Sequence, residues 1–261
     1  MNTPYLIDTH THIYYHDRKN IETHIQRCRS NNIQKVLMPN VNTESIKQIQ
    51  SALETYPDFC IPMMGLHPCS VKENHQAELS IIKQTLDNMK VCAIGEIGID
   101  LHWDTSTLSW QKQVFETQVQ WALEKNLPID IHCRKAFDEI FEILDGIKKT
   151  NAKLKGVFHC FTGNTEQAYR AIDLGFLLGI GGIVTYKNAG LDKVVKDIDL
   201  KHIILETDAP YLSPVPYRGK PNESSYLIYI AEKIADLKGC TIEEVARITT
   251  QNANKIFSLS Q

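Results

Sequence analysis

The segment PIDIHCRKAFDEIFEILDGIKKTNAKLKGVFHCF, residues 128–161, holds two short apolar runs separated by one amphipathic stretch. The runs PIDIHC (128–133) and GVFHCF (156–161) are short and mostly apolar, which is typical of parallel strands buried on both faces. Between them, four branched apolar residues recur at helical spacing: Ile140, Ile143, Leu144 and Ile147. The segment therefore predicts a strand, a helix and a second strand in succession.

The same alternation continues along the whole chain. Six further runs are predicted as strands: 5–10, 35–40, 60–67, 91–98, 176–182 and 202–207. Helices are predicted at 43–55, 76–89, 110–125, 136–147, 164–174, 188–197 and 227–237, with a last helix that begins at the capping box Thr241 to Glu244. Eight strands that alternate with helices predict an α/β fold, a single (β/α)8 TIM-barrel domain over residues 1–261. A doubly wound open sheet is the alternative.

Charge and cysteine content limit the environment and the partners. The formal net charge is −3, so no broad basic field would hold nucleic acid, and a polyanion would need local features such as bound cations. Seven cysteines without a Cys-x-x-Cys pair, and no secretory signal, indicate free thiols in the cytoplasm. Cys133 and Cys160 each follow a strand histidine, so strand alternation predicts that both face the helices. The longest apolar stretch, 176–184, is too short to span a membrane.

Polar side chains occur late on strands that are otherwise apolar. In a parallel barrel the carboxyl ends of the strands meet at one mouth, and an unpaired polar group there is costly to bury. Any one of these residues alone fits a hydrogen-bonded core histidine or a helix cap. Together, six such groups on five strands indicate one shared site: His10, His12, Glu96, His132, His159 and Asp208.

Four imidazoles and two carboxylates suit two divalent cations. Glu96 has two oxygens and could bridge the cations, and such a pair activates water and holds a phosphoryl group. Asp208, at the end of the last strand, could accept the proton of the attacking water. Asp8 lies deeper than His10 and is expected to support the site without binding a cation.

Seven segments resemble, in order, the TatD-like metal-dependent deoxyribonucleases of the amidohydrolase-type barrel superfamily. They are IDTHTHIY (7–14), GLHP (65–68), GEIGID (95–100), IDIHCRKA (129–136), GVFHCFTG (156–163), ETDAPYLSP (206–214) and RGKPNES (218–224). The resemblance implies a barrel of the metallo-dependent hydrolase type with two divalent ions, Mg, Mn or Zn. It implies that one ion is held by His10, His12, Glu96 and Asp208 and the other by Glu96, His132 and His159, with Asp208 as general base.

The resemblance also implies a substrate. Family members mostly act as 3′ to 5′ exonucleases on DNA, and the acidic net charge fits single-stranded or frayed ends better than a long duplex. No obligate protein partner is evident. One alternative keeps the two-metal centre but acts on another ester or amide, such as an aminoacyl-tRNA or a lactone. A second alternative is a metal-loaded binding protein without turnover.

Five further residues are candidates for substrate contact. The resemblance suggests that His67 contacts a substrate phosphate, against a packing role. The guanidinium group of Arg134 matches the geometry of a phosphate, and the alternative is a salt bridge at the start of a helix. Lys187 has the same two alternatives. Arg218 could form a basic rim on the DNA path or lie in a solvated loop. Trp103 could stack an unpaired base or pack over the barrel top.

Overall fold

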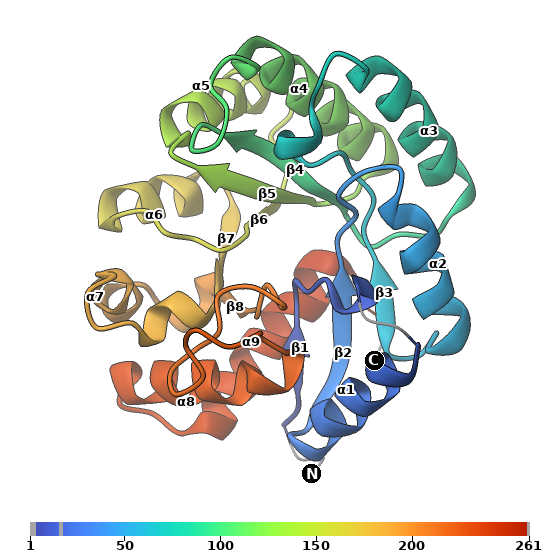
Figure 1. The fold of residues 1–261 in the computed structure, drawn as a ribbon. Helices are drawn as coiled ribbons and strands as arrows, with labels where there is room; N and C mark the ends of the chain where they lie inside the picture. The colour runs from blue at the N-terminus through green and yellow to red at the C-terminus, as the bar shows by residue number, and fades with distance from the viewer. Residues whose placement is uncertain (1–3, 16–17, 260–261) are drawn as a thin grey trace.

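The computed structural model describes residues 4–15 and 18–259, in which helices surround eight parallel strands (Figure 1). The strands are β1 Leu6–Asp8, β2 Ile33–Met38, β3 Cys60–Pro62, β4 Ile94–Asp100, β5 Ile129–Arg134, β6 Gly156–Phe158, β7 Phe176–Ile180 and β8 Ile203–Leu205. The α-helices are α1 Arg18–Ser30, α2 Ser45–Thr55, α3 His75–Asn88, α4 Leu108–Lys125, α5 Phe137–Lys148, α6 Thr165–Asp173, α7 Leu191–Asp197, α8 Leu227–Lys238 and α9 Ile242–Phe257. Short 3-10 turns are η1 Ile13–Tyr15, η2 Pro68–Ser70, η3 Gly182–Thr185, η4 Leu200–His202 and η5 Ser224–Tyr226.

The strands pair in chain order as two parallel sheets, β1-β2-β3 and β4-β5-β6-β7-β8. Backbone hydrogen bonds link the two sheets at both seams. Gly95 N–H donates to the Met64 carbonyl at 3.2 Å beside β4, and Thr9 N–H donates to the Leu205 carbonyl at 3.0 Å beside β8. The strands thus form the predicted (β/α)8 barrel rather than an open sheet.

The predicted helices from 43–55 onward begin and end within three residues of the observed ones, and Thr241 caps α9 by accepting a hydrogen bond from Glu244 N–H. Helix α1 was not predicted because its apolar residues are few. The runs 60–67 and 156–161 are longer than the strands that form, since β3 ends at Pro62 and β6 at Phe158. The run 5–10 also extends beyond β1, which ends at Asp8, so the placement of His10, His67 and His159 inside strands is wrong. None of the described helices combines the length and apolar character needed to cross a bilayer.

Helix α9 closes the end of the barrel where the strands begin. Thr250 Oγ1 donates to the carbonyl of Tyr5, just before β1, and Asn252 Nδ2 donates to the carbonyl of Ile203, the first residue of β8. In Figure 1 the helix passes behind β1 and β8. Ile256 and Phe257 of its last turn form one buried cluster with residues in or just after the strands: Ile7, Leu37, Met63, Val157 and Ile204. With this end filled, the opposite end of the barrel is left for a site.

Gly98 allows β4 and β5 to approach closely at the level of the site. It pairs with His132, has a φ of 147°, and a Cβ added to it would lie 2.0 Å from the His132 carbonyl oxygen. Gly98→Ala is therefore expected to lower the free energy of unfolding by about 1–3 kcal/mol, as overpacking does. Urea denaturation measures this change.

A matched control for this substitution is available in α5. A Cβ added to Gly146 meets no atom within 4 Å, so Gly146→Ala is expected to raise the free energy of unfolding by about 0.5–1 kcal/mol through helix propensity. Equal stabilities of the two variants would contradict the steric account of Gly98.

Candidate metal centre

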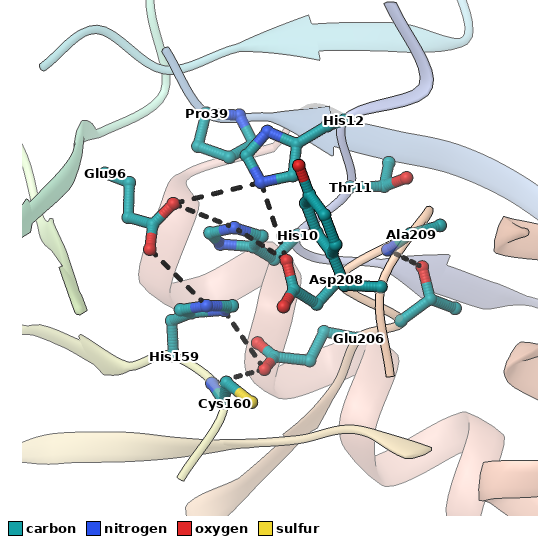
Figure 2. Close-up of polar contacts among 12 residues, drawn as sticks. His10, Thr11, His12, Pro39, Glu96, His159, Cys160, Glu206, Asp208 and Ala209 are labelled. Atoms are coloured by element: carbon teal, nitrogen blue, oxygen red, sulfur yellow. Dashed lines mark hydrogen bonds and ion pairs between the residues drawn. The ribbon is translucent and has the colours of Figure 1, made fainter. Parts of the chain in front are cut away.

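The strand ends bring the other five predicted donor residues around the buried carboxylate of Glu96 on β4. Figure 2 shows this carboxylate facing the imidazoles of His10, His12 and His159. Its oxygen Oε2 lies 3.4 Å from His10 Nε2 and 3.9 Å from His12 Nε2. Its oxygen Oε1 faces three other imidazoles, at 2.7 Å from His132 Nδ1, 3.6 Å from His159 Nε2 and 3.2 Å from His67 Nε2. The two oxygens thus divide five histidines into two groups.

Asp208 completes the Oε2 side. Its Oδ1 lies 3.5 Å from His12 Nε2 and 3.8 Å from His10 Nε2. Four overlapping sets of donors have ligand atoms within 4.8 Å of one another: His10–His12–Asp208, His10–Glu96–His159, His67–Glu96–His132 and His159–Cys160–Glu206. The first three surround Glu96, so the geometry offers ligands on both sides of one carboxylate.

Both carboxylates are held ionised. Burial raises the pKa of Glu96, but the neighbouring His67, His159 and His10 outweigh burial, and the pKa lies well below its usual value. Burial likewise opposes ionisation of Asp208, but its hydrogen bond to His12 and the surrounding histidines leave its pKa lowered. Two negative groups in a buried site rich in imidazoles attract a cation more strongly than they would in water.

An outer carboxylate lies beside one ring nitrogen of three histidines, and for His10 and His132 it is a hydrogen-bond partner. Asp130 Oδ2 lies 2.8 Å from His10 Nδ1, and Glu206 Oε1 lies 3.2 Å from His159 Nδ1. Asp100 Oδ2 lies 2.9 Å from His132 Nε2. A carboxylate that accepts a hydrogen bond from one nitrogen of a neutral imidazole leaves the lone pair of the other nitrogen for a cation. The hydrogen bonds of His10 and His132 thus leave Nε2 of His10 and Nδ1 of His132 for the centre, whereas Nε2 of His159 faces Glu96 and its Nδ1 is within ion-pair distance of Glu206.

One buried atom tests whether a cation fits this donor set. His10 Nε2 has no hydrogen-bond partner in the described part of the chain, although its side chain is fully buried. In the neutral ring with its proton on Nδ1, Nε2 carries a lone pair, and it faces carboxylate oxygens that also carry only lone pairs. A divalent cation among these atoms would satisfy all of them, and imidazole with carboxylate suits zinc or manganese. The residues therefore fit the ions that the sequence predicts.

The family model described as TatD related DNase matches residues 7–258. The chain belongs to this family. The metal-dependent hydrolase YabD of Bacillus subtilis is 40% identical over 258 residues, which cover 98% of this chain and 100% of YabD. The 3′-5′ ssDNA/RNA exonuclease TatD of Pantoea ananatis is 32% identical over 242 residues, or 90% of this chain and 92% of that protein.

The crystal structure of YjjV, a TatD homolog from Escherichia coli K12, has a TM-score of 0.91 at 26% identity and covers 99% of this chain and 100% of YjjV. These similarities extend over the whole barrel, so they are not confined to single motifs. Family membership and the donor set together identify the chain as a metal-dependent hydrolase of the TatD type.

His67 lies among the donors of this TatD-type centre but differs in its protonation. Its Nδ1 accepts a hydrogen bond from Cys69 N–H at 3.0 Å, at the start of η2. The proton of the neutral ring is therefore on Nε2, which faces Glu96 Oε1 at 3.2 Å. An N–H group suits a phosphate oxygen better than a cation. The phosphate contact that the sequence suggests is thus compatible with the geometry.

His12 has a phenol where the other three histidines have a carboxylate. Its Nδ1 lies 2.8 Å from the hydroxyl of Tyr14, and that hydroxyl donates to the Pro39 carbonyl at 2.6 Å. Because the phenol proton is already used, Tyr14 can only accept from His12 Nδ1–H, which leaves Nε2 free toward Asp208. Burial lowers the pKa of His12 below its usual value, which agrees with a neutral ring.

Removal of the Tyr14 hydroxyl is expected to loosen this ligand. Tyr14→Phe should lower cation affinity about tenfold, the effect typical of losing an outer partner of a ligand histidine. Equilibrium dialysis with elemental analysis measures the affinity. Tyr5→Phe is the matched control, because the Tyr5 hydroxyl contacts Asn254 at the other end of the barrel. Equal affinities of the two variants would show that His12 does not depend on Tyr14.

The remaining predicted substrate residues lie at the end of a strand or on a segment that follows one. The Arg134 guanidinium lies 5.4 Å from the centre of the Trp103 ring, so these two candidates form one pair. Arg218 lies 4.4 Å from the centre of the Tyr186 ring, and Lys187 is exposed directly after that tyrosine. Trp103 and Arg134 border one part of the mouth, while Tyr186, Lys187 and Arg218 follow β7 and β8.

Two other residues can now be placed. Asp8 accepts hydrogen bonds from Thr207 N–H at 2.9 Å and Thr207 Oγ1 at 2.6 Å, so it supports the backbone beside Asp208 without contacting a ligand ring. The prediction that Cys160 faces the helices is wrong. Beyond the end of β6, Cys160 has a φ of 43° and its N–H donates to Glu206. Strand alternation does not apply in such a turn, and the thiol lies near His159 and Glu206.

Proposed function

We propose that the chain hydrolyses phosphodiester bonds of DNA, removing nucleotides from the 3′ end of single strands with two divalent cations. The division of the histidines between the two oxygens of Glu96 carries the proposal, because a bridging carboxylate is the core of a two-metal centre. The name of the Pantoea ananatis relative supports nucleic acid as the substrate and the 3′ to 5′ direction.

Each cation has a proposed ligand set of this chain's own residues. One set is His10, His12, Glu96 and Asp208, and the other is Glu96, His132 and His159. Mg, Mn and Zn are the candidate ions. Bound there, the cations would polarise the phosphoryl group and lower the pKa of a water molecule.

Asp208 is the proposed general base. Its carboxylate is ionised, and its side chain is 14% exposed, so a water molecule at the mouth can reach it. The carboxylate accepts a proton from the attacking water and can return it to the oxygen that leaves phosphorus. The Nε2–H of His67 donates to a phosphoryl oxygen, which stabilises negative charge as it develops there.

Positive side chains near the mouth would hold the substrate backbone. Arg134 offers a fork that matches phosphate, and Lys187 and Arg218 lie beyond β7 and β8. With a net charge of −3, the chain has no broad basic surface for a long duplex. A few local contacts suit the end of a single strand.

A cleavage assay on single-stranded DNA tests this function. Oligonucleotides labelled at the 5′ end, or at the 3′ end, are incubated with chelated protein and with protein given Mg, Mn, Zn or Co. Stepwise shortening of the 5′-labelled strand, release of labelled mononucleotide from the 3′-labelled strand, and loss of both after chelation are expected. Intact DNA under every condition would contradict the nuclease function. If the protein then hydrolysed a lactone or an aminoacyl-tRNA, the centre would act on another ester or amide instead.

A further inference from the structure

Exposed aromatic and apolar side chains gather at the mouth of the barrel. In the described part of the chain, seven large apolar residues are exposed, and five of them follow the ends of β1, β4 or β8: Tyr15, Trp103, Tyr211, Leu212 and Val215. The other two, Ile81 and Tyr169, lie on the outer helices α3 and α6. Exposed aromatic rings at a functional site commonly mark a contact surface.

Two of these rings converge on the ligand His12. The Tyr15 ring lies parallel to the His12 imidazole, with centroids 5.3 Å apart and an angle of 11°. The Tyr211 ring approaches the same imidazole edge-on at 5.9 Å. Tyr15 is 40% exposed and Tyr211 is 53% exposed, so both rings keep a free surface beside the centre.

The backbone of Tyr211 is fixed on both sides. Its N–H donates to the Asp208 carbonyl at 2.8 Å, and its carbonyl accepts from Nδ2 of the buried Asn222 at 2.6 Å. The N–H of Tyr15 in turn donates to the His12 carbonyl at 3.0 Å. The backbones that carry the two rings are therefore tied to residues of the centre, and the contacts of the rings with His12 restrict them further, which lowers the entropic cost of binding.

Charge separates this tyrosine pair from the other exposed ring. None of the arginine or lysine side chains found over aromatic rings in the described residues lies over Tyr15 or Tyr211. Trp103, by contrast, is paired with the guanidinium of Arg134. In a nucleic acid cut at its end, the strand carries phosphates on one side of the scissile bond, while the terminal nucleoside carries none beyond it. The phosphates of the strand are therefore expected beside the guanidinium of Arg134, and the uncharged terminal nucleoside beside the two tyrosine rings.

We propose that Tyr15 and Tyr211 form a stacking subsite for the terminal nucleobase of a single-stranded DNA or RNA end. This inference rests on the proposed nuclease function and assigns the side of the centre on which the released nucleotide lies. Stacking on an aromatic ring tolerates every base, so the subsite gives binding without sequence preference.

The test compares two oligonucleotides that differ only in the terminal residue. One has an ordinary 3′-terminal nucleotide and the other has an abasic tetrahydrofuran residue, and kcat/KM is measured for removal of that residue. The wild-type ratio is expected to be about tenfold or more in favour of the base. Tyr211→Leu and Tyr15→Leu should bring the ratio close to one, while Tyr211→Phe should retain it. The same pair modified at the 5′ end covers the opposite direction.

Tyr169→Leu is the matched control, since it removes an exposed tyrosine from α6, and it should keep the wild-type ratio. Fluorescence anisotropy of the two oligonucleotides on chelated protein gives a second readout, in which Tyr211→Leu should abolish the preference for the terminal base. Cleavage of both substrates at equal rates by the wild type would overturn the subsite and leave the nuclease function standing. No cleavage of either substrate with any metal would overturn the nuclease function and the subsite together.

Discussion

Replacement of Asp208 by asparagine is expected to lower kcat for phosphodiester hydrolysis about 10³-fold, within the range for loss of a general base. An amide oxygen at this position can still face His12, but it cannot accept the proton of the attacking water. The fold should tolerate the change, because Asp208 has a φ of 56° and asparagine enters this left-handed region as readily as aspartate.

Single-turnover hydrolysis measures the rate of the chemical step. The metal content and the melting temperature of each preparation show whether a lower rate comes instead from fewer bound ions or from loss of the fold. Asp58→Asn serves as the control, because Asp58 is exposed in the turn before β3, at the opposite end of the barrel. A metal-loaded Asp208→Asn variant with a rate within threefold of wild type, about 0.7 kcal/mol in barrier height, would remove Asp208 from the role of base.

Replacement of Glu96 by glutamine is expected to have the larger effect on metal binding. Both oxygens of Glu96 are used, since five histidine nitrogens lie between 2.7 and 3.9 Å from them. Glutamine keeps one oxygen and turns an NH₂ group toward nitrogens that should present lone pairs. Loss of a residue that only contacts a metal ligand typically lowers metal affinity by up to about 100-fold. Because Glu96 is itself a proposed ligand, we expect the affinity for at least one ion to fall by about 100-fold or more.

Dialysis against limiting metal followed by elemental analysis gives the stoichiometry. Wild-type protein should hold two ions per chain and Glu96→Gln at most one, with no measurable hydrolysis. Glu116→Gln on the exposed face of α4 loses the same charge and should match the wild type. Two ions bound to Glu96→Gln at wild-type affinity would disprove the bridging role.

The residues of the centre were predictable because parallel strands end at the same edge of a barrel. Polar side chains late on apolar strands could therefore be assigned to one mouth without knowledge of their distances. The outer carboxylates were not predictable in this way. Asp130 precedes His132 by two residues on β5, yet it contacts His10 on the far side of the barrel interior. Such a pairing depends on which strands face each other across the barrel, and the order of residues in the chain does not specify it.

Turns set a second limit on prediction. Cys160 lies one residue after the proposed ligand His159, and strand periodicity would turn it outward, but the strand has already ended. The proton on His67 Nε2 depends on the Cys69 N–H, a backbone group whose direction follows from η2. No motif in the sequence shows that the hydroxyl of Tyr14 contacts His12 Nδ1 whereas the ring of Tyr15 stacks on the same imidazole. In each case the deciding contact is made by a local backbone turn, which side-chain patterns do not reveal.

Cations bound at the centre would stabilise the closure of the barrel, because the proposed ligands lie on both sides of a seam. His10 and His12 follow β1 of one sheet, whereas Glu96, His132, His159 and Asp208 belong to the other sheet or follow its strands. Any opening at the β8–β1 seam, where Asp208 N–H donates to the His10 carbonyl at 2.9 Å, would pull these donors apart. Ions that bind only the closed form oppose such opening by mass action. Loading should therefore slow hydrogen exchange of the Thr9 and Asp208 amides, and two sheets that could fluctuate separately would become one cooperative unit.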